Sequence, residues 1–95
     1  MYIKEKWSQI TMQKIWEKGK IVLNNDPKIY RRDACGAWMK FNDHGDREAK
    51  YGWEIDHIHP ESLGGTDELN NLQPLHWKNN VKKGDSPILK CEITN

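Results

Sequence analysis

The stretch GWEIDHIHP at residues 52–60 decides how this chain folds. From residue 52 to residue 58, large apolar residues alternate with charged ones, which predicts a strand with one face on the core. Pro60 ends that strand. Residues 61–68 follow with two adjacent glycines, which predict an irregular surface loop.

The chain beyond this loop predicts a second strand at residues 69–75 and a helix at residues 76–83. Gly84 then ends the helix, and lysines lie in its last turn. The predicted order is therefore strand, loop, strand, helix.

The predicted helix supplies candidate metal ligands. His76 and Asn80 are four residues apart, so a helix places both on one face, while Trp77 and Val81 share another. A helix lying across the two strands would bring Asn80 to the carboxylate of Asp56, and His76 is an open alternative as a further ligand. Such an oxygen-rich site favours one divalent ion, Mg²⁺ or Mn²⁺, with Zn²⁺ or Ni²⁺ as alternatives.

His57 is the candidate base. It directly follows Asp56, and neighbours on a regular strand point to opposite faces. We therefore expect the strand to end or bend here, so that both side chains reach one site. A neutral imidazole beside a metal can take a proton from water, which is the role that a hydrolase needs.

The first half of the chain predicts supporting elements. A helical stripe predicts a helix at residues 8–18, and short strands are expected at residues 21–23 and 37–41. Aromatic side chains supply large apolar surfaces, and four of them are the candidate core: Trp7, Trp16, Trp38 and Trp53.

Charge divides the chain into three parts. Residues 1–40 carry a net charge of +5, residues 41–76 of −6, and residues 77–95 of +2. An acidic centre between basic flanks suits a protein that binds a polyanion around a central cation, because phosphates otherwise repel carboxylates. Ordinary solvated surface charge is the alternative.

The 95 residues allow one domain. We expect residues 1–50 to support the motif, residues 51–85 to form it and residues 86–95 to be a tail. No apolar run reaches the ~18 residues of a membrane span, so we expect no membrane contact and a cytoplasmic location.

The two cysteines, Cys35 and Cys91, form no C-x-x-C pair. Their spacing suggests neither a zinc ribbon nor a disulfide scaffold. We expect buried free thiols.

Four short motifs carry a family resemblance. WEIDHIHP at 53–60, GG at 64–65, NLQPL at 71–75 and NNVKKGD at 79–85 together resemble the HNH endonucleases, which are ββα-metal or His-Me finger nucleases. The resemblance covers about residues 51–85. It implies an α+β fold, a small single domain whose C-terminal ββα-metal unit packs against an N-terminal helix and short strands.

The resemblance also assigns roles. His57 matches the general base that activates water, and Asp56 matches a metal ligand. Asn71 matches the central asparagine, which usually pins the loop between the strands and so orients the base. Asn80 matches the last metal-binding position, which is His in some members and Asn in others, such as the HNH domain of CRISPR effector nucleases.

His76 lies where many members have a zinc-binding cysteine and where colicin-type nucleases have a histidine ligand, so its role as a metal ligand stays open. Phosphate contacts are expected from three lysines beside the site helix: Lys78, Lys82 and Lys83. The chain departs from the common pattern because it lacks the paired cysteines that bind structural zinc in many HNH domains.

The resemblance implies a metal-dependent endonuclease that hydrolyses DNA phosphodiester bonds, with double-stranded DNA as partner and a monomer or homodimer as the active form. Two alternatives are a non-catalytic DNA-binding module on the same fold and a nuclease toxin domain controlled by an immunity partner.

Overall fold

The computed structural model describes residues 7–95. It has the α+β class, with two α-helices and two small antiparallel sheets. The elements run in the order α1 (Gln9–Trp16), β1 (Tyr30–Arg32), β2 (Trp38–Lys40), η1 (Phe41–Asp43), β3 (Trp53–His57), η2 (Glu61–Leu63), η3 (Leu69–Asn71), β4 (Leu72–His76) and α2 (Trp77–Lys83), where η marks a 3-10 helix.

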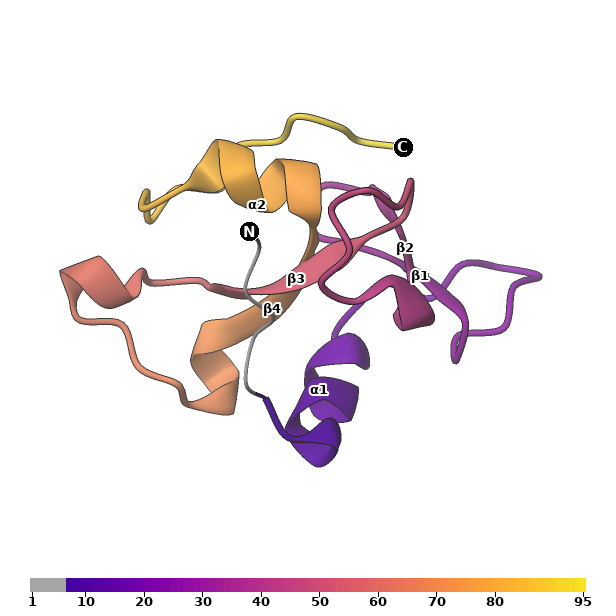
Figure 1. Cartoon of the computed structure of the whole chain (residues 1–95), viewed down its shortest axis with the longest axis horizontal. Coiled ribbons are helices and arrows are strands. Elements are labelled where there is room, and N and C mark those ends of the chain that lie inside the picture. The colour runs from indigo at the N-terminus through magenta and orange to yellow at the C-terminus, as the bar shows by residue number, and fades with distance from the viewer. Residues whose placement is uncertain (1–6) are drawn as a thin grey trace.

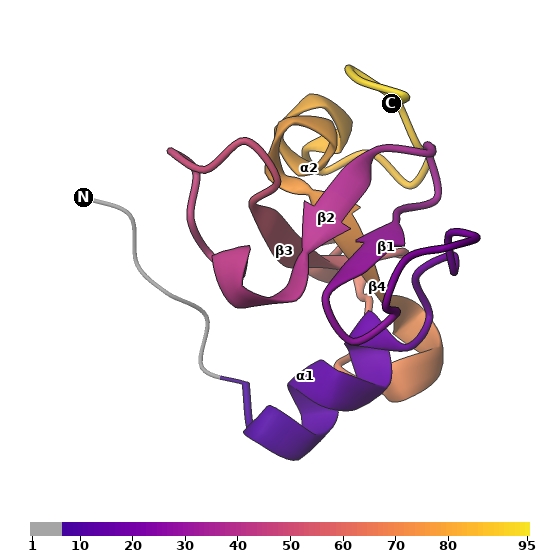
Figure 2. The ribbon, with the colours of Figure 1, turned by 90° about the vertical axis from the view of Figure 1, so that its right-hand side faces the viewer.

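Two sheets form the centre of the molecule. β1 pairs with β2, and β3 pairs with β4 in a register that places Asp56 opposite Gln73. α1 and α2 lie on opposite sides of the β3–β4 pair in both views (Figures 1 and 2). Neither is long and apolar enough to cross a bilayer, and the same holds for every helix of residues 7–95.

β3 is buried on both faces, which corrects the prediction of a strand with one exposed face. Trp53 and Ile55 join the apolar core on the side of α1. The alternate residues, Glu54 and Asp56, are also buried, and they meet α2. The charged residues of the alternating pattern face a second packed layer instead of water.

α1 forms where a helix was predicted, but it is shorter than residues 8–18. Ser8 is its N-cap and accepts a hydrogen bond from the backbone N–H of Thr11 at 3.1 Å. Its last two residues, Ile15 and Trp16, are completely buried in the core.

The tryptophan core is only partly as predicted. Trp16 and Trp53 are fully buried, with ring centroids 5.1 Å apart. Trp7 and Trp38 are half-buried. Trp38 lies under the guanidinium of Arg32 in the β1–β2 sheet.

The predicted strand at residues 21–23 is wrong. Only Lys20 bridges to β1, through Arg32. The chain then turns at Asn24, whose φ is +66°, and it leaves Ile21 and Leu23 exposed. The apolar residues 21–23 do not form a strand because no neighbouring strand pairs with them.

The prediction of free thiols is also wrong. Cys35, after β1, and Cys91, in the C-terminal tail, form a disulfide across 56 residues of sequence. Cys35 is half-buried and Cys91 is exposed. The pairing arises because the tail runs back along α2 towards the β1–β2 sheet (Figure 1), a path that the spacing of the cysteines in the sequence does not show.

Candidate functional site

A polar cavity of about 330 Å³ lies where β3 ends, between the following loop and α2. Asp56, His57 and Asn80 all line it. Three of the residues that the sequence singled out therefore border one cavity, although β3 and α2, which carry them, are about twenty residues apart in the chain.

Asp56 lies at the inner wall of this cavity and is 5% exposed. Its Oδ2 accepts a hydrogen bond from Nε2 of Gln73, directly across the strand pair, at 2.9 Å. Its Oδ1 lies 3.2 Å from Nζ of Lys83. Burial raises the pKa of Asp56 above its usual value, and the contacts with Gln73 and Lys83 oppose that shift only in part.

Asn80 reaches the cavity from α2. Its amide nitrogen donates to Oε1 of Glu54 at 2.8 Å. Glu54 is buried and also accepts two hydrogen bonds from Arg47, at 2.6 and 2.9 Å. This contact orients the Asn80 amide, and its carbonyl oxygen is the atom that remains to bind a cation.

His57 is the last residue of β3, and its side chain is 17% exposed. Its Nε2 lies 2.7 Å from Oδ1 of Asp67, and its Nδ1 lies 3.9 Å from Oε1 of Glu61. Ligand atoms of these three residues all lie within 4.8 Å of one another. The sequence did not point to Asp67 or Glu61, because the loop path that folds them onto the histidine has no local signal.

Asn71 fastens that loop. Its Oδ1 accepts from the backbone N–H of His59 at 2.8 Å, and its Nδ2 donates to the carbonyls of His59, at 3.1 Å, and Thr66, at 2.7 Å. Backbone hydrogen bonds of this kind are what the resemblance led us to expect of this residue.

The two glycines of the loop are needed where they lie. Gly64 ends η2 with a φ of +96°, which L side chains rarely adopt. A Cβ at Gly65 would lie 1.7 Å from the carbonyl oxygen of His59. The loop can fold back on the end of β3 only with a glycine at this second position.

The sequence was compared with models of known protein families. The family model described as HNH endonuclease matches residues 38–86, just over half of the chain. The chain belongs to the HNH endonuclease family. Searches of curated proteins and of solved structures found no match.

The HNH match spans β2, β3, β4 and α2, and so contains the whole cavity. It leaves out α1 and the C-terminal tail. The disulfide joins Cys91, outside the match, to Cys35, also outside it. Both flanking parts pack on the HNH segment without supplying Asp56, His57 or Asn80.

His76 does not fit the predicted role of a metal ligand. It is 1% exposed and pairs with Trp53, at the opposite end of the strand pair from His57. Its Nε2 lies 2.8 Å from the carbonyl of Lys50, and its Nδ1 accepts from the backbone N–H of Lys78 at 3.1 Å. Both ring nitrogens are used, and the residue caps α2 instead of reaching the cavity.

Lys83 does not fit the predicted phosphate contact either. Its side chain is 1% exposed, and besides Asp56 its ammonium donates to the carbonyl of His57 at 2.9 Å. The reason is the orientation of α2. The helix turns Asn79 and Lys83 inwards and leaves Val81 53% exposed.

Asp33 and Asn79 form a buried polar centre that the sequence did not point to. Asp33 accepts from the backbone N–H groups of Cys35, Ala37 and His76 and from the Asn79 amide. Asn79 also bonds the tail, accepting from the N–H groups of residues 92 and 93 and donating to a carbonyl. These contacts join β1, β4, α2 and the tail.

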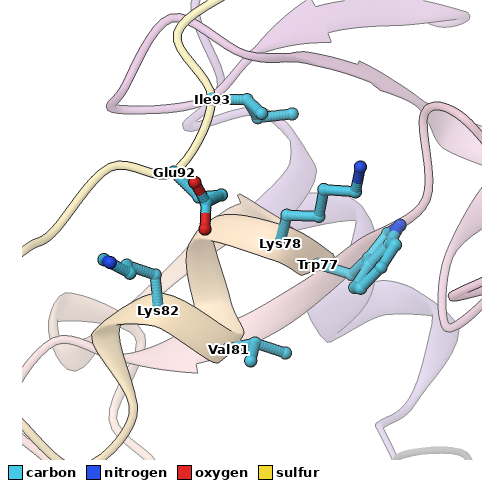
Figure 3. A pocket seen from close by; sticks show the side chains of 6 residues that line it. All are labelled: Trp77, Lys78, Val81, Lys82, Glu92 and Ile93. Atoms are coloured by element: carbon cyan, nitrogen blue, oxygen red, sulfur yellow. The ribbon is translucent and has the colours of Figure 1, made fainter.

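Lys78 and Lys82 are exposed on α2. They line a second cavity of about 600 Å³ with Trp77 and Val81 of the helix and with Glu92 and Ile93 of the tail (Figure 3). Val81 also lines the cavity of Asp56. The two lysines therefore lie on a surface next to the candidate site.

Proposed function

We propose that this HNH family member is a divalent-metal-dependent endonuclease that hydrolyses phosphodiester bonds of double-stranded DNA. The observation that carries the proposal is the cavity that Asp56, His57 and Asn80 share. A carboxylate, an imidazole and an amide at one polar cavity are the groups needed to hold a cation and to take a proton from water. The unit that supplies them is, in this proposal, a ββα-metal unit made by β3, β4 and α2.

The residues present suit a hard divalent ion. Asp56 and Asn80 would hold it through oxygen, which Mg²⁺ and Mn²⁺ prefer. Asp56 has capacity for this, because each carboxylate oxygen has two lone pairs and Gln73 and Lys83 each use one. When bound, the ion would supply positive charge opposite the phosphate and the departing 3′-oxygen.

The protein's own groups perform the remaining steps. His57, which lines the cavity, takes a proton from the attacking water. Asn71 keeps the loop folded so that the imidazole stays at the end of β3. Lys78 and Lys82 attract the backbone phosphates along α2, at a strength that falls as salt rises.

The resemblance implies products with 5′-phosphate and 3′-hydroxyl ends. One cavity cuts one strand at a time, so cleavage of both strands takes two protomers or two successive encounters. A monomer or a homodimer fits this scheme.

Nicking of supercoiled plasmid DNA with Mg²⁺ or Mn²⁺ tests the proposal. His57→Ala should lower the nicking rate by roughly 10²–10⁴-fold, the usual contribution of general-base catalysis, and leave a measurable residual rate. His59→Gln is the matched control, because His59 is exposed and its ring lies 3.0 Å from the loop carbonyl of Leu63, away from the hydrogen bonds that Asp56 and Asn80 make within residues 7–95. It should keep most of the activity.

Metal binding is measured separately by calorimetry with Mn²⁺. Asp56→Asn keeps an oxygen for the Lys83 ammonium but removes the charge, so it should weaken binding while the protein stays folded. DNA binding without any metal-dependent nicking would favour the non-catalytic DNA-binding module. Death of host cells that express the protein alone would instead favour the toxin domain.

A further inference from the structure

The contact between His57 and Asp67 is the shortest that the candidate base makes. Nε2 and Oδ1 are 2.7 Å apart, within the range of a charge-assisted hydrogen bond. The two residues are ten positions apart, on either side of the loop between β3 and β4. Asp67 is 67% exposed, so the loop backbone must hold it in place.

Asn71 holds both ends of this contact. One side-chain amide bonds the backbone of His59, two residues after the base, and the carbonyl of Thr66, the residue before Asp67. Gly65 adds a hydrogen bond from its N–H to the carbonyl of Pro60 at 2.9 Å. The loop that carries the carboxylate is therefore tied directly to the end of the strand that carries the imidazole.

The carboxylate selects one form of the imidazole. An ionised Asp67 can only accept, so Nε2 of His57 must carry the hydrogen. In the neutral ring the lone pair is then on Nδ1. That nitrogen faces Glu61 at 3.9 Å, and Glu61 lines the same cavity as Asp56 and Asn80.

We propose that Asp67 is a positioning residue, which holds His57 in the Nε2–H tautomer with Nδ1 presented to the cavity as the proton-accepting atom. This inference rests on the proposed nuclease function, in which His57 is the base. Asp67 does not touch the reacting atoms in this scheme and acts only through His57.

Nicking kinetics of Asp67 variants test the proposal. Asp67→Ala should lower kcat by roughly 10–100-fold, the usual effect of losing a partner that orients a functional histidine, and leave the KM for plasmid unchanged. Asp67→Asn should behave similarly, because an amide can donate as well as accept and so no longer selects one tautomer. Glu68→Gln, which removes one charge from the same exposed loop, is the matched control and should keep wild-type kcat.

The double variant gives the decisive comparison. In a His57→Ala background, Asp67→Ala should cause no further loss, because a residue that acts through another contributes nothing once that residue is gone. An additional loss, or a weaker Mn²⁺ affinity in Asp67→Asn, would overturn the proposal and reassign Asp67 to the metal or to the substrate.

A spectroscopic measurement tests the tautomer without any activity. The ¹⁵N chemical shifts of the neutral His57 ring in the metal-free protein should show hydrogen on Nε2 in the wild type and a mixture of tautomers in Asp67→Ala. Hydrogen on Nδ1 in the wild type would refute the inference. If no variant and no wild type nicks DNA, the proposed function fails, while this measurement still decides the role of Asp67.

Discussion

Breaking the Cys35–Cys91 disulfide should strongly destabilise the protein. The perturbation is either reduction or the double substitution Cys35→Ser/Cys91→Ser. The bond closes a loop across 56 residues, and the chain entropy that it removes from the unfolded state corresponds to roughly 4 kcal/mol at 25 °C. A domain of this size shifts its Tm by about 4–8 °C per kcal/mol, so Tm should fall by roughly 15–30 °C.

The structure adds a second reason for a large effect. The tail has no regular secondary structure, and besides the disulfide it is held by the contacts of Asn79 with residues 92 and 93. Asn79 is completely buried, so loss of the tail would leave its oxygen without these donors. The stability of the protein should therefore depend on the redox state of its surroundings, since a reducing cytoplasm keeps most thiols reduced.

Thermal unfolding followed by circular dichroism, with and without reductant, measures the effect. Wild-type protein should lose Tm on reduction, and the double serine variant should start near the reduced value and not respond to reductant. An unchanged Tm in reduced wild-type protein would refute the reasoning. Nicking well below both transitions should persist, because Asp56, His57 and Asn80 are held by contacts that the disulfide does not touch.

Three other predictions concern the site. Lys83→Met should lower the free energy of unfolding of the metal-free protein, measured in urea, by about 3–5 kcal/mol, because it leaves a buried carboxylate without its ammonium. Lys82→Met on the exposed face should change that free energy by less than about 0.5 kcal/mol, and equal effects of the two substitutions would contradict the buried ion pair. Burial raises the pKa of Asp56, so the metal-free wild type should be most stable relative to Asp56→Asn below about pH 4 and should lose that advantage as pH rises. Urea unfolding of both proteins from about pH 3 to 7 measures this, and a wild-type stability that rises with pH relative to the variant would disprove it. Asn71→Ala should lower kcat by about 10–100-fold with unchanged DNA affinity by fluorescence anisotropy, and an equal loss of affinity would make Asn71 a substrate contact.

Much of the site could be predicted from the sequence because its signals are local. The order of strand, loop, strand and helix follows from periodicity within residues 52–84, and the structure has that order. Asp56, His57 and Asn80 line one cavity because an antiparallel pair with a short helix behind it allows few arrangements. The two adjacent glycines also predicted a break in regular structure, and residues 64–68 lie in no helix or strand.

The errors concern residues whose surroundings come from distant parts of the chain. His76 was a candidate ligand by helical spacing, but a carbonyl from residue 50 and the cap of α2 use both of its nitrogens. Lys83 looked like a surface lysine, and only the packing of α2 on β3 shows that its ammonium is buried against Asp56. Periodicity could not settle which face of α2 turns inwards, since its buried residues Asn79 and Lys83 are polar and are held by hydrogen bonds and an ion pair.

By itself, then, the sequence determined the β3–β4–α2 order and pointed to Asp56, His57, Asn71 and Asn80 as the candidate site residues, because motif and spacing act over a few residues. Only the tertiary structure decided that Cys35 meets Cys91, that Asp33 meets Asn79 and that Asp67 meets His57. These pairs depend on how the loops and the tail return to the sheets. Burial and pairing between distant segments produce no periodic pattern in the sequence.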